Sequence, residues 1–550
     1  MVNHIVGIPR LQLQMSSLED SIGQDNPVRF IDAFVEQLDL LKLGFEVKTL
    51  KKEGRPSFES ATLLKIYLYG YLNGLRSSRR LETECCRNIE LQWLTLGLKP
   101  NYHTIADFRK DNPKALKNVF KLFVSFLKDI DLVSGQVVAI DGTKSRAHNS
   151  KKNNYNQKKI ERHLAYIEEK STEYINLLEQ NDFQDDLIKV SDIQEKINRL
   201  KKNKIKYEIL QEQLLSTNEP QISTTDPDSR ALLVHGQVVE VCYNVQAAVD
   251  EKHKLVIATH TINRNDRNAL TDIALEAKVN LETENFIAIL DKGYHNGREI
   301  QQCKDANIVT IVAPSEIVNS NTHGTTPEYV VTNFIYNEES DCYTCPQGNI
   351  LNTTGSWHKK SRDNHNSYRF KKYRTPDCKT CPVKHLCTGR ASGGREIERS
   401  EFASAVEENN KRYKDNAVLY RKRQEINEHI FGTIKRKWGY YYTNLKGLVK
   451  VNGEHSLIML VYNIKRCFSI LGIPELIEKL RNWVSPYKKG PNFSQNWLIL
   501  SLWELLFFLQ PTRRSIKIVP LSRLKFGYMK FYQVFYVFGS KNYGIFTVCR

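Results

Sequence analysis

The sequence of 550 residues predicts an α/β protein in which an all-α N-terminal domain precedes a mixed β-sheet interrupted by two inserts. Apolar runs that end in Asp, a mostly β-branched one at residues 137–141 and another at 286–291, predict buried strands. Residues 158–215 contain no Pro or Gly and predict long inserted helices. A cluster of cysteines marks the second insert, residues 315–415.

The composition predicts a soluble, cytoplasmic protein that binds a polyanion. The formal net charge is +18 and the pI is about 9.2, with Lys and Arg spread through the chain. Nucleic acid is the simplest partner for such a surplus, although many intracellular proteins are basic without binding one. We see no secretory signal, and the apolar run at residues 497–509 is short for a membrane span. We therefore expect no membrane contact and reduced cysteines.

Residues 1–130 show the apolar spacing of helices and form the predicted N-terminal domain. Arg76, Arg79 and Arg80 lie at a turn within it. Short helices with arginines at their turns can dock on DNA as a helix-turn-helix does. A plain helical bundle with a solvated basic face explains the same pattern, so both interpretations stay open.

Residues 131–314 predict the first part of the sheet. A strand that ends in a turn at Asp141 is followed by the helical insert, by two strands within residues 238–262, and by alternating helices and strands, one ending at Asp291. This order fits a mixed sheet of the ribonuclease-H kind, in which the first and fourth strands are neighbours. Asp141 and Asp291 would then be adjacent and could bind divalent metal ions. Taken alone, each aspartate is better explained as a turn former.

Residues 158–215 place Ile and Leu at every third or fourth position, as in two long helices broken near residues 180–186. We expect a helical hairpin inserted between strands. It could contact DNA or a partner subunit, and a solvated spacer explains its composition equally well.

Residues 315–415 predict a zinc-ribbon-like insert that contains two Cys-x2-Cys pairs and one later cysteine. Its cysteines are Cys342, Cys345, Cys378, Cys381 and Cys387. Paired cysteines on tight turns suit a tetrahedral structural zinc ion. Five cysteines compete for four places, and the alternatives are incidental reduced thiols or a site that includes His385.

Residues 416–437 predict a helix, and residues 416–480 complete the core with helices. Glu425, Glu428 and Lys435 share one face of that helix at i, i+3 and i+10. Such a carboxylate could complete a metal site, and an ordinary solvent-exposed Glu–Lys helix is the other interpretation. Residues 481–550 form an appended tail of unknown role.

Several short motifs follow one another along the chain. They are Asp141-Gly142-Thr143, Asp291-Lys292-Gly293-Tyr294 and Glu428-His429-x-Phe431-Gly432-Thr433-Ile434-Lys435, with N-terminal segments at 69–82 and 103–109. Together they resemble the DDE transposases of bacterial insertion sequences, over residues 25–475, and most closely the subgroup with a Cys-rich insert before the catalytic Glu. The chain departs from the family at Ile430, where the family often has Pro.

The resemblance implies a DNA transposase that hydrolyses phosphodiester bonds and transfers strands at terminal inverted repeats. By resemblance, Asp141, Asp291 and Glu428 are the catalytic residues and hold two Mg²⁺ or Mn²⁺ ions. The resemblance assigns a possible structural zinc ion to Cys345, Cys378, Cys381 and Cys387. Candidate DNA contacts are Arg76, Arg79, Arg80, Lys144, Lys292, Arg423, Lys435 and Arg436.

The implied partners are double-stranded DNA, both the inverted repeats and the target, and further copies of the chain in a homodimer or larger assembly. Two other functions fit the same residues. One is a catalytically inactive DNA-binding remnant of a transposase, and the other is a metal-dependent nuclease of the same fold that only hydrolyses.

Overall fold

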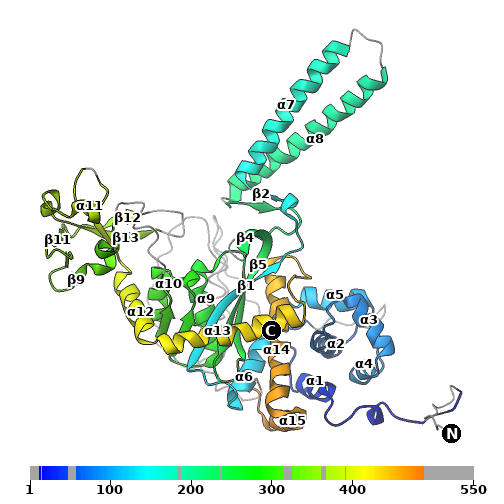
Figure 1. Cartoon of the computed structure of the whole chain (residues 1–550). Helices are drawn as coiled ribbons and strands as arrows, with labels where there is room; N and C mark the ends of the chain where they lie inside the picture. Colours follow the sequence, from blue (N-terminus) through cyan, green and yellow to red (C-terminus); the bar gives the residue numbers. More distant parts are fainter. Residues whose placement is uncertain are drawn as a thin grey trace, which may run out of the picture. The chain divides into compact units, whose positions relative to one another are not determined.

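The computed structural model describes residues 11–13, 15–46, 57–181, 187–217, 219–234, 238–314, 325–360, 367–390 and 392–487. The predicted tail, residues 481–550, lies outside the described residues from 488 onward. The described chain contains both helices and mixed β-sheets, which confirms the predicted α/β class (Figure 1).

The N-terminal part is helical, as predicted. After a 3₁₀ turn at Glu19–Ser21, its helices are α1 (Pro27–Glu36), α2 (Ser60–Leu72), α3 (Ser78–Arg87), α4 (Ile89–Leu94), α5 (Tyr102–Asp111) and α6 (Pro113–Asp129). Asparagine side chains cap the N-termini of α1 and α5. The Asn26 side chain accepts a hydrogen bond from the Val28 backbone N–H, and the Asn101 side chain accepts one from the Thr104 backbone N–H.

The central sheet has six strands: β1 (Val137–Arg146), β4 (Arg230–Val234), β5 (Val238–Asp250), β6 (Val256–Ile262), β7 (Phe286–Leu290) and β8 (Ile308–Val312). Their order is β4-β5-β1-β7-β8, and β6 also pairs with β5. β5 is antiparallel to β1, β4 and β6, whereas β1, β7 and β8 are parallel. Helix α10 (Gly297–Asp305) provides the crossover between the parallel neighbours β7 and β8, and helix α9 (Leu270–Leu281) connects β6 to β7.

The first strand does not end at Asp141 as the sequence suggested. β1 continues through Asp141 and Gly142 to Arg146, because β5 pairs with it along this whole stretch and Arg146 lies opposite Cys242. The Asp-Gly pair therefore lies inside a strand and not in a turn.

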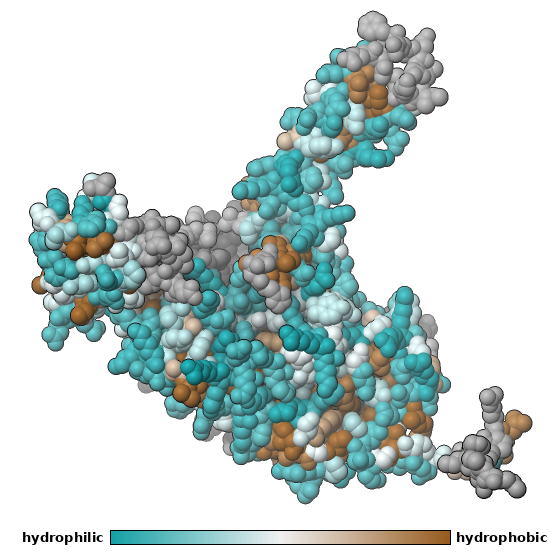
Figure 2. Space-filling view, in the orientation of Figure 1, coloured by the Kyte–Doolittle hydropathy of each residue, from teal (hydrophilic) through white to brown (hydrophobic). Residues whose placement is uncertain are grey.

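A helical hairpin lies between β1 and β4. It consists of a 3₁₀ turn (Lys151–Asn153), β2 (Asn154–Tyr155), α7 (Gln157–Asn181), α8 (Leu187–Thr217) and β3 (Ile222–Ser223). β2 pairs with β3, and α7 packs along α8 (Figure 1). Its apolar cluster is small, with Tyr155, Ile160, Leu210 and Leu214 as the buried members. The face drawn in Figure 2 is mostly hydrophilic over this hairpin.

The cysteine-bearing insert forms a second six-stranded sheet with its own small core. The strands are β9 (Ile335–Asn337), β10 (Cys342–Thr344), β11 (Ile350–Thr353), β12 (His358–Lys360), β13 (Tyr368–Arg374) and β14 (Ile397–Ser400). Short helical turns lie at Pro327–Tyr329, Val331–Asn333, Pro376–Lys379 and α11 (Lys384–Cys387). Leu351, Tyr373 and Ile397 are among the buried residues that hold it together.

The remaining helices return the chain to the central sheet. They are α12 (Ala403–Asp415), α13 (Ala417–Phe431), a π-helical segment (Gly432–Lys437), α14 (Leu448–Leu471) and α15 (Ile473–Asn482). α14 is buried on nearly all sides and packs against α6, α2 and β6, as an apolar helix must. One hydrophobic core therefore runs from Ile22 to Trp483 and includes both the N-terminal helices and the sheet.

Among the described residues, no single helix is long and apolar enough to cross a membrane. Only α14 and α15 taken together reach that length and composition, and they are bent by 109° at their junction.

Candidate active site

Asp141 and Asp291 lie on neighbouring parallel strands. Ile140 of β1 is paired with Leu290 of β7, and each aspartate is the next residue. Both carboxylates accept a hydrogen bond from the following backbone N–H, at 2.8 Å from Gly142 and at 2.6 Å from Lys292. The predicted adjacency of the two strands is therefore present.

The surroundings of Asp141 disfavour its charged form. Burial is the main cause and raises the pKa of the Asp141 carboxyl to about 6, while the Gly142 N–H and the Arg423 guanidinium act in the opposite direction. The negative charges of Asp266 and Asp291 raise the pKa further. The carboxylates of Asp141, Asp266 and Asp291 are therefore close enough for the charge of one to affect the protonation of another.

Asp266 is a residue that sequence reasoning missed. It follows β6 in a 3₁₀ turn (Asp266–Asn268), and its Oδ1 accepts hydrogen bonds from Asn244 Nδ2 at 2.7 Å and from Gln246 Nε2 at 2.9 Å. Its Oδ2 lies 3.4 Å from Lys144 Nζ. The sequence signal that could have pointed to Asp266 was the alternation of Asn244 and Gln246 with apolar residues in β5. Both amides are fully buried in the structure, and buried amides need hydrogen-bond partners such as Asp266.

Gly142 is required by close approach and not by a turn. A Cβ built at Gly142 would come within 2.4 Å of Gln246 Nε2, 2.5 Å of Asp266 Oδ1 and 2.8 Å of Asn244 Oδ1. A real Cβ does not approach other heavy atoms so closely, so any side chain here would displace the amides that hold Asp266. The glycine beside Asp141 thus belongs to the same cluster.

Tyr294 interacts electrostatically with all three carboxylates. Its ring is fully buried, and its hydroxyl donates to Gln246 Oε1. Burial first, and then the charges of Asp266, Asp141 and Asp291, raise its pKa well above the ordinary value. Tyr294 therefore stays a neutral donor, and one hydrogen-bonded chain runs from its hydroxyl through Gln246 to Asp266.

Helix α13 brings Arg423 to this cluster and also carries Glu428. Arg423 Nη1 lies 3.4 Å from Asp141 Oδ2. Glu428 is exposed and accepts a hydrogen bond from Gln424 at 2.8 Å. Helical residues advance by about 100° each, so Glu428 lies about 140° around the axis from Arg423. Asn427, one residue earlier, is buried, and neither atom of its amide has a hydrogen-bond partner in the described chain.

No group of three or more His, Cys, Asp or Glu side chains within the described ranges is arranged to hold a metal ion. Asp141, Asp291 and Asp266 influence one another electrostatically, but in the described residues neither these three nor Asp141, Asp291 and Glu428 form a metal-binding group.

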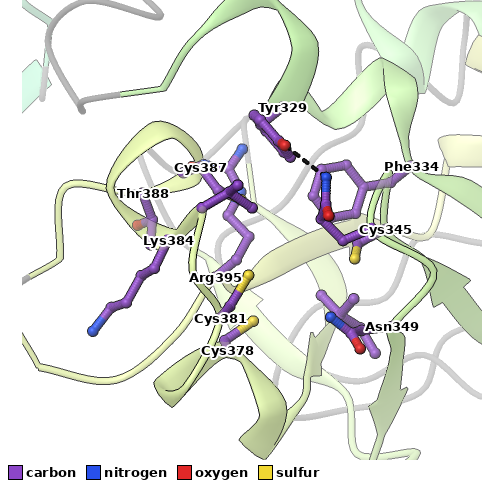
Figure 3. A pocket seen from close by; sticks show the side chains of 13 residues that line it. Tyr329, Phe334, Cys345, Asn349, Cys378, Cys381, Lys384, Cys387, Thr388 and Arg395 are labelled. Atoms are coloured by element: carbon purple, nitrogen blue, oxygen red, sulfur yellow. Dashed lines mark hydrogen bonds between the residues drawn. The ribbon is translucent and has the colours of Figure 1, made fainter.

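Four cysteines of the insert line one pocket (Figure 3). They are Cys345, Cys378, Cys381 and Cys387. The fifth, Cys342, is buried in β10 beside Ser340 Oγ at 3.0 Å and does not line the pocket. Burial raises the pKa of the Cys387 thiol, and the three other thiols of the pocket contribute to the rise. His385 is not among the lining residues.

Two family models match the chain. One, described as a transposase DDE domain, matches residues 344–468, and one described as a transposase domain (DUF772) matches residues 16–111. The chain belongs to the DDE transposases of insertion-sequence type. No match was found among curated proteins or among solved structures.

These matches confirm the resemblance at the level of the family, whereas the subgroup with a Cys-rich insert stays a prediction. The first match includes α13 with Glu428, and the second covers helices α1–α5 of the transposase. DDE transposases typically use divalent metal ions and act on DNA.

The basic residues predicted near the site of this transposase differ in exposure. Lys435 Nζ donates to the Lys144 carbonyl at 2.7 Å, and burial lowers the pKa of Lys435. Lys292 and Arg436 are exposed. Lys144 and Arg423 approach carboxylates of the cluster, as described above.

The three predicted N-terminal arginines of the transposase also separate into two groups. Arg76 is buried, donates to Glu454 at 2.8 Å and lies over the rings of Tyr440 and Tyr442. Arg79 and Arg80 are exposed. Arg76 thus contacts α14 from within the core, and the other two face solvent.

Proposed function

We propose that this transposase cleaves DNA at the terminal inverted repeats of its element and joins the resulting 3′-hydroxyl to target DNA. Asp141, Asp291 and Glu428 are its proposed catalytic residues, with two Mg²⁺ or Mn²⁺ ions as cofactors. The observation that carries the proposal is the pairing of Ile140 with Leu290, because Asp141 within β1 and Asp291 just after β7 are the next residues of these neighbouring strands. The strand order also supports a ribonuclease-H-like core.

The carboxylate cluster has the chemistry that hard divalent cations require. Oxygen ligands suit Mg²⁺ and Mn²⁺, and a carboxylate whose charged form is disfavoured by burial gains from a nearby cation. Arg423 and Lys144 already place positive charge 3.4 Å from Asp141 and Asp266. When bound, a metal pair would activate the attacking hydroxyl and stabilise the leaving oxygen.

Two observations support Glu428 as the third catalytic residue. The match to the transposase DDE domain includes it, and its helix α13 packs on β1. Because Glu428 forms no metal-binding group with the two aspartates in the described residues, we propose that α13 turns when Glu428 serves as a ligand. The π-helical segment directly after α13 contains the extra residue that allows such a turn. If the extra residue of the π-helical segment were accommodated before position 427 instead of after α13, each following residue would shift by one position around the helix. Glu428 would then occupy the place of Asn427, whose buried amide lacks hydrogen-bond partners.

The residues around the carboxylates would position them and the DNA. Asp266, held by two amides, would act as a positioning residue that keeps Lys144 beside the site. Lys292, Lys435 and Arg436, with Arg423, are the proposed phosphate contacts.

Two further parts of the proposal concern assembly and zinc. Both DNA ends are handled together, which supports a homodimer or larger assembly. The four pocket cysteines support a structural zinc ion, because a closed set of thiolates serves folding and not catalysis.

The decisive experiment uses duplex DNA that carries the element's ends, with Mn²⁺ or Mg²⁺. We expect the wild type to cleave these ends and to join pre-cleaved ends, and Asp141→Asn and Asp291→Asn to do neither. Asp272→Asn is the matched control, because Asp272 is an exposed acid on α9 outside the cluster.

The other outcomes overturn the proposal in distinct ways. Hydrolysis without joining would indicate a nuclease, and DNA binding without cleavage would indicate an inactive remnant. Equal Mn²⁺ binding by the wild type and by Asp291→Asn would remove Asp291 from the site.

A further inference from the structure

The helical hairpin is divided by charge along its length. We define the hairpin base as residues 151–164 and 199–210, and the hairpin outer half as residues 165–179 and 192–198. The hairpin base contains ten Lys and Arg residues and two Glu. The hairpin outer half contains six Asp and Glu residues and two Lys. A spacer that only contacts water would not require basic residues to gather in the hairpin base and acidic residues in the hairpin outer half.

We propose that the hairpin base binds the phosphate backbone of duplex DNA that extends from the active site. The inference rests on the proposed function, because it assumes that DNA is the substrate. It adds a DNA-binding surface outside the motifs of the family and outside the carboxylate cluster.

The basic side chains of the hairpin base are available to a partner. Nine are exposed, and Lys159 is the partly buried exception. In the described part of the hairpin, Arg199 has an ion-pair partner, Glu195, and no ion pair involves Lys201, Lys202 or Lys204. Positive charges that are neither buried nor neutralised are what a polyanion requires.

The fold of the hairpin does not depend on these exposed lysines. Its packing comes from the apolar cluster around Tyr155 and from His163 stacked on Tyr207, with ring centroids 4.7 Å apart. Lys159 serves structure, since its Nζ donates to three backbone carbonyls, including that of Asn154 at 2.7 Å. Burial lowers the pKa of His163, and so do Lys159, Arg162 and Lys206, which shows that positive potential accumulates here.

The hairpin base is also close to the catalytic strand along the chain. β1 carries Asp141 and ends at Arg146, and the hairpin base begins at Lys151. A chain spans at most about 3.3–3.6 Å per residue, so Lys151 lies within about 35 Å of Asp141. That is about one helical turn of B-DNA. A duplex held at the carboxylates can therefore reach the hairpin base within roughly one turn.

The test compares two double variants of the same hairpin with equal loss of charge. Lys201→Gln/Lys204→Gln changes two exposed residues at i, i+3 on one side of α8 in the hairpin base. Lys170→Gln/Lys196→Gln is the matched control in the hairpin outer half. Binding to a mixed-sequence duplex of about 40 base pairs, roughly four turns, is measured without added Mn²⁺ or Mg²⁺ from about 0.05 to 0.2 M salt.

We expect the hairpin-base variant to bind about ten- to thirtyfold more weakly at ~0.15 M salt and to lower the salt slope by about 1.8. The control should bind as the wild type does. An unchanged thermal unfolding midpoint would show that the hairpin-base variant is folded. Because no Mn²⁺ or Mg²⁺ is added, the binding result is independent of whether the wild type cleaves DNA with Mn²⁺.

Two results would overturn the inference. One is equal affinity and equal slope for both variants and the wild type. The other is unchanged DNA binding with a lower molar mass of the hairpin-base variant in light scattering. In that case the hairpin base pairs with the acidic outer half of a second copy instead.

Discussion

The buried Glu454 side chain offers the sharpest test of how the N-terminal helices are joined to the rest of the transposase. It lies on α14, is fully buried, and accepts hydrogen bonds from Arg76 at 2.8 Å and from the Asn444 and Leu445 backbones at 3.0 and 3.1 Å. Arg109 of α5 lies 3.8 Å away. Two cations from the N-terminal part thus converge on one carboxylate of the core.

The contribution of the Glu454 charge to the free energy of unfolding can be estimated from its pKa. Burial acts to raise it, but Arg109 and Arg76 outweigh burial and lower the pKa from 4.5 to about 2. Since each tenfold change in a binding constant is about 1.4 kcal/mol, this charge contributes about 3 kcal/mol to folding at neutral pH. Removal of one partner from a buried ion pair costs a similar ~3–5 kcal/mol.

We therefore expect Glu454→Gln to lower the free energy of unfolding by about 3 kcal/mol at pH 7. Urea unfolding, followed by circular dichroism and by tryptophan fluorescence, measures the change. Glu475→Gln is the control, because the exposed pair of Glu475 with Lys479 should contribute no more than about 1 kcal/mol.

The pH dependence has a definite sign. The folded-state pKa is depressed, so the stabilisation is present above about pH 4.5 and is lost as the pH falls toward 2. The difference between the wild type and Glu454→Gln should narrow over that interval. A loss below about 1 kcal/mol at pH 7, or a difference that stays constant with pH, would refute the electrostatic reasoning.

Three further predictions concern the site and the insert. Asp266→Asn removes a negative charge that raises the pKa of Asp141, so the pH midpoint of Mn²⁺ binding should move downward; an unmoved midpoint would mean that the two carboxylates do not interact. Asn427→Leu replaces a buried amide that lacks hydrogen-bond partners with an apolar group of similar size, so it should raise the free energy of unfolding in urea by about 1–3 kcal/mol. The same substitution should reduce DNA cleavage, because the proposed turn of α13 places Glu428 at this position. A lower free energy of unfolding would contradict the interpretation that the amide is unpartnered. Cys381→Ser should lower the zinc content measured by mass spectrometry, whereas Cys86→Ser, at an exposed cysteine outside the pocket, should not; equal zinc in both would exclude the four-thiolate site.

The sequence by itself determined the types of the main elements and much of their order. The short apolar runs before Asp141 and Asp291, bounded by turn-forming residues, favoured buried strands, and the structure pairs these strands in one sheet. The absence of Pro and Gly in residues 158–215 left long helices as the stable choice. Motifs in a fixed order along the chain were enough to identify the family.

Only the tertiary structure decided which side chains meet. Asp266 is far from Asp141 in sequence, and the antiparallel register of β5 against β1 brings its amide partners beside Gly142. Arg76 looks like a surface arginine in the sequence, yet α14 supplies the buried carboxylate that makes its burial possible. The direction of Glu428 depends on the rotation of α13, which spacing along a helix leaves open. Local patterns determine elements because they act over a few residues, whereas contacts between distant residues depend on how the elements pack.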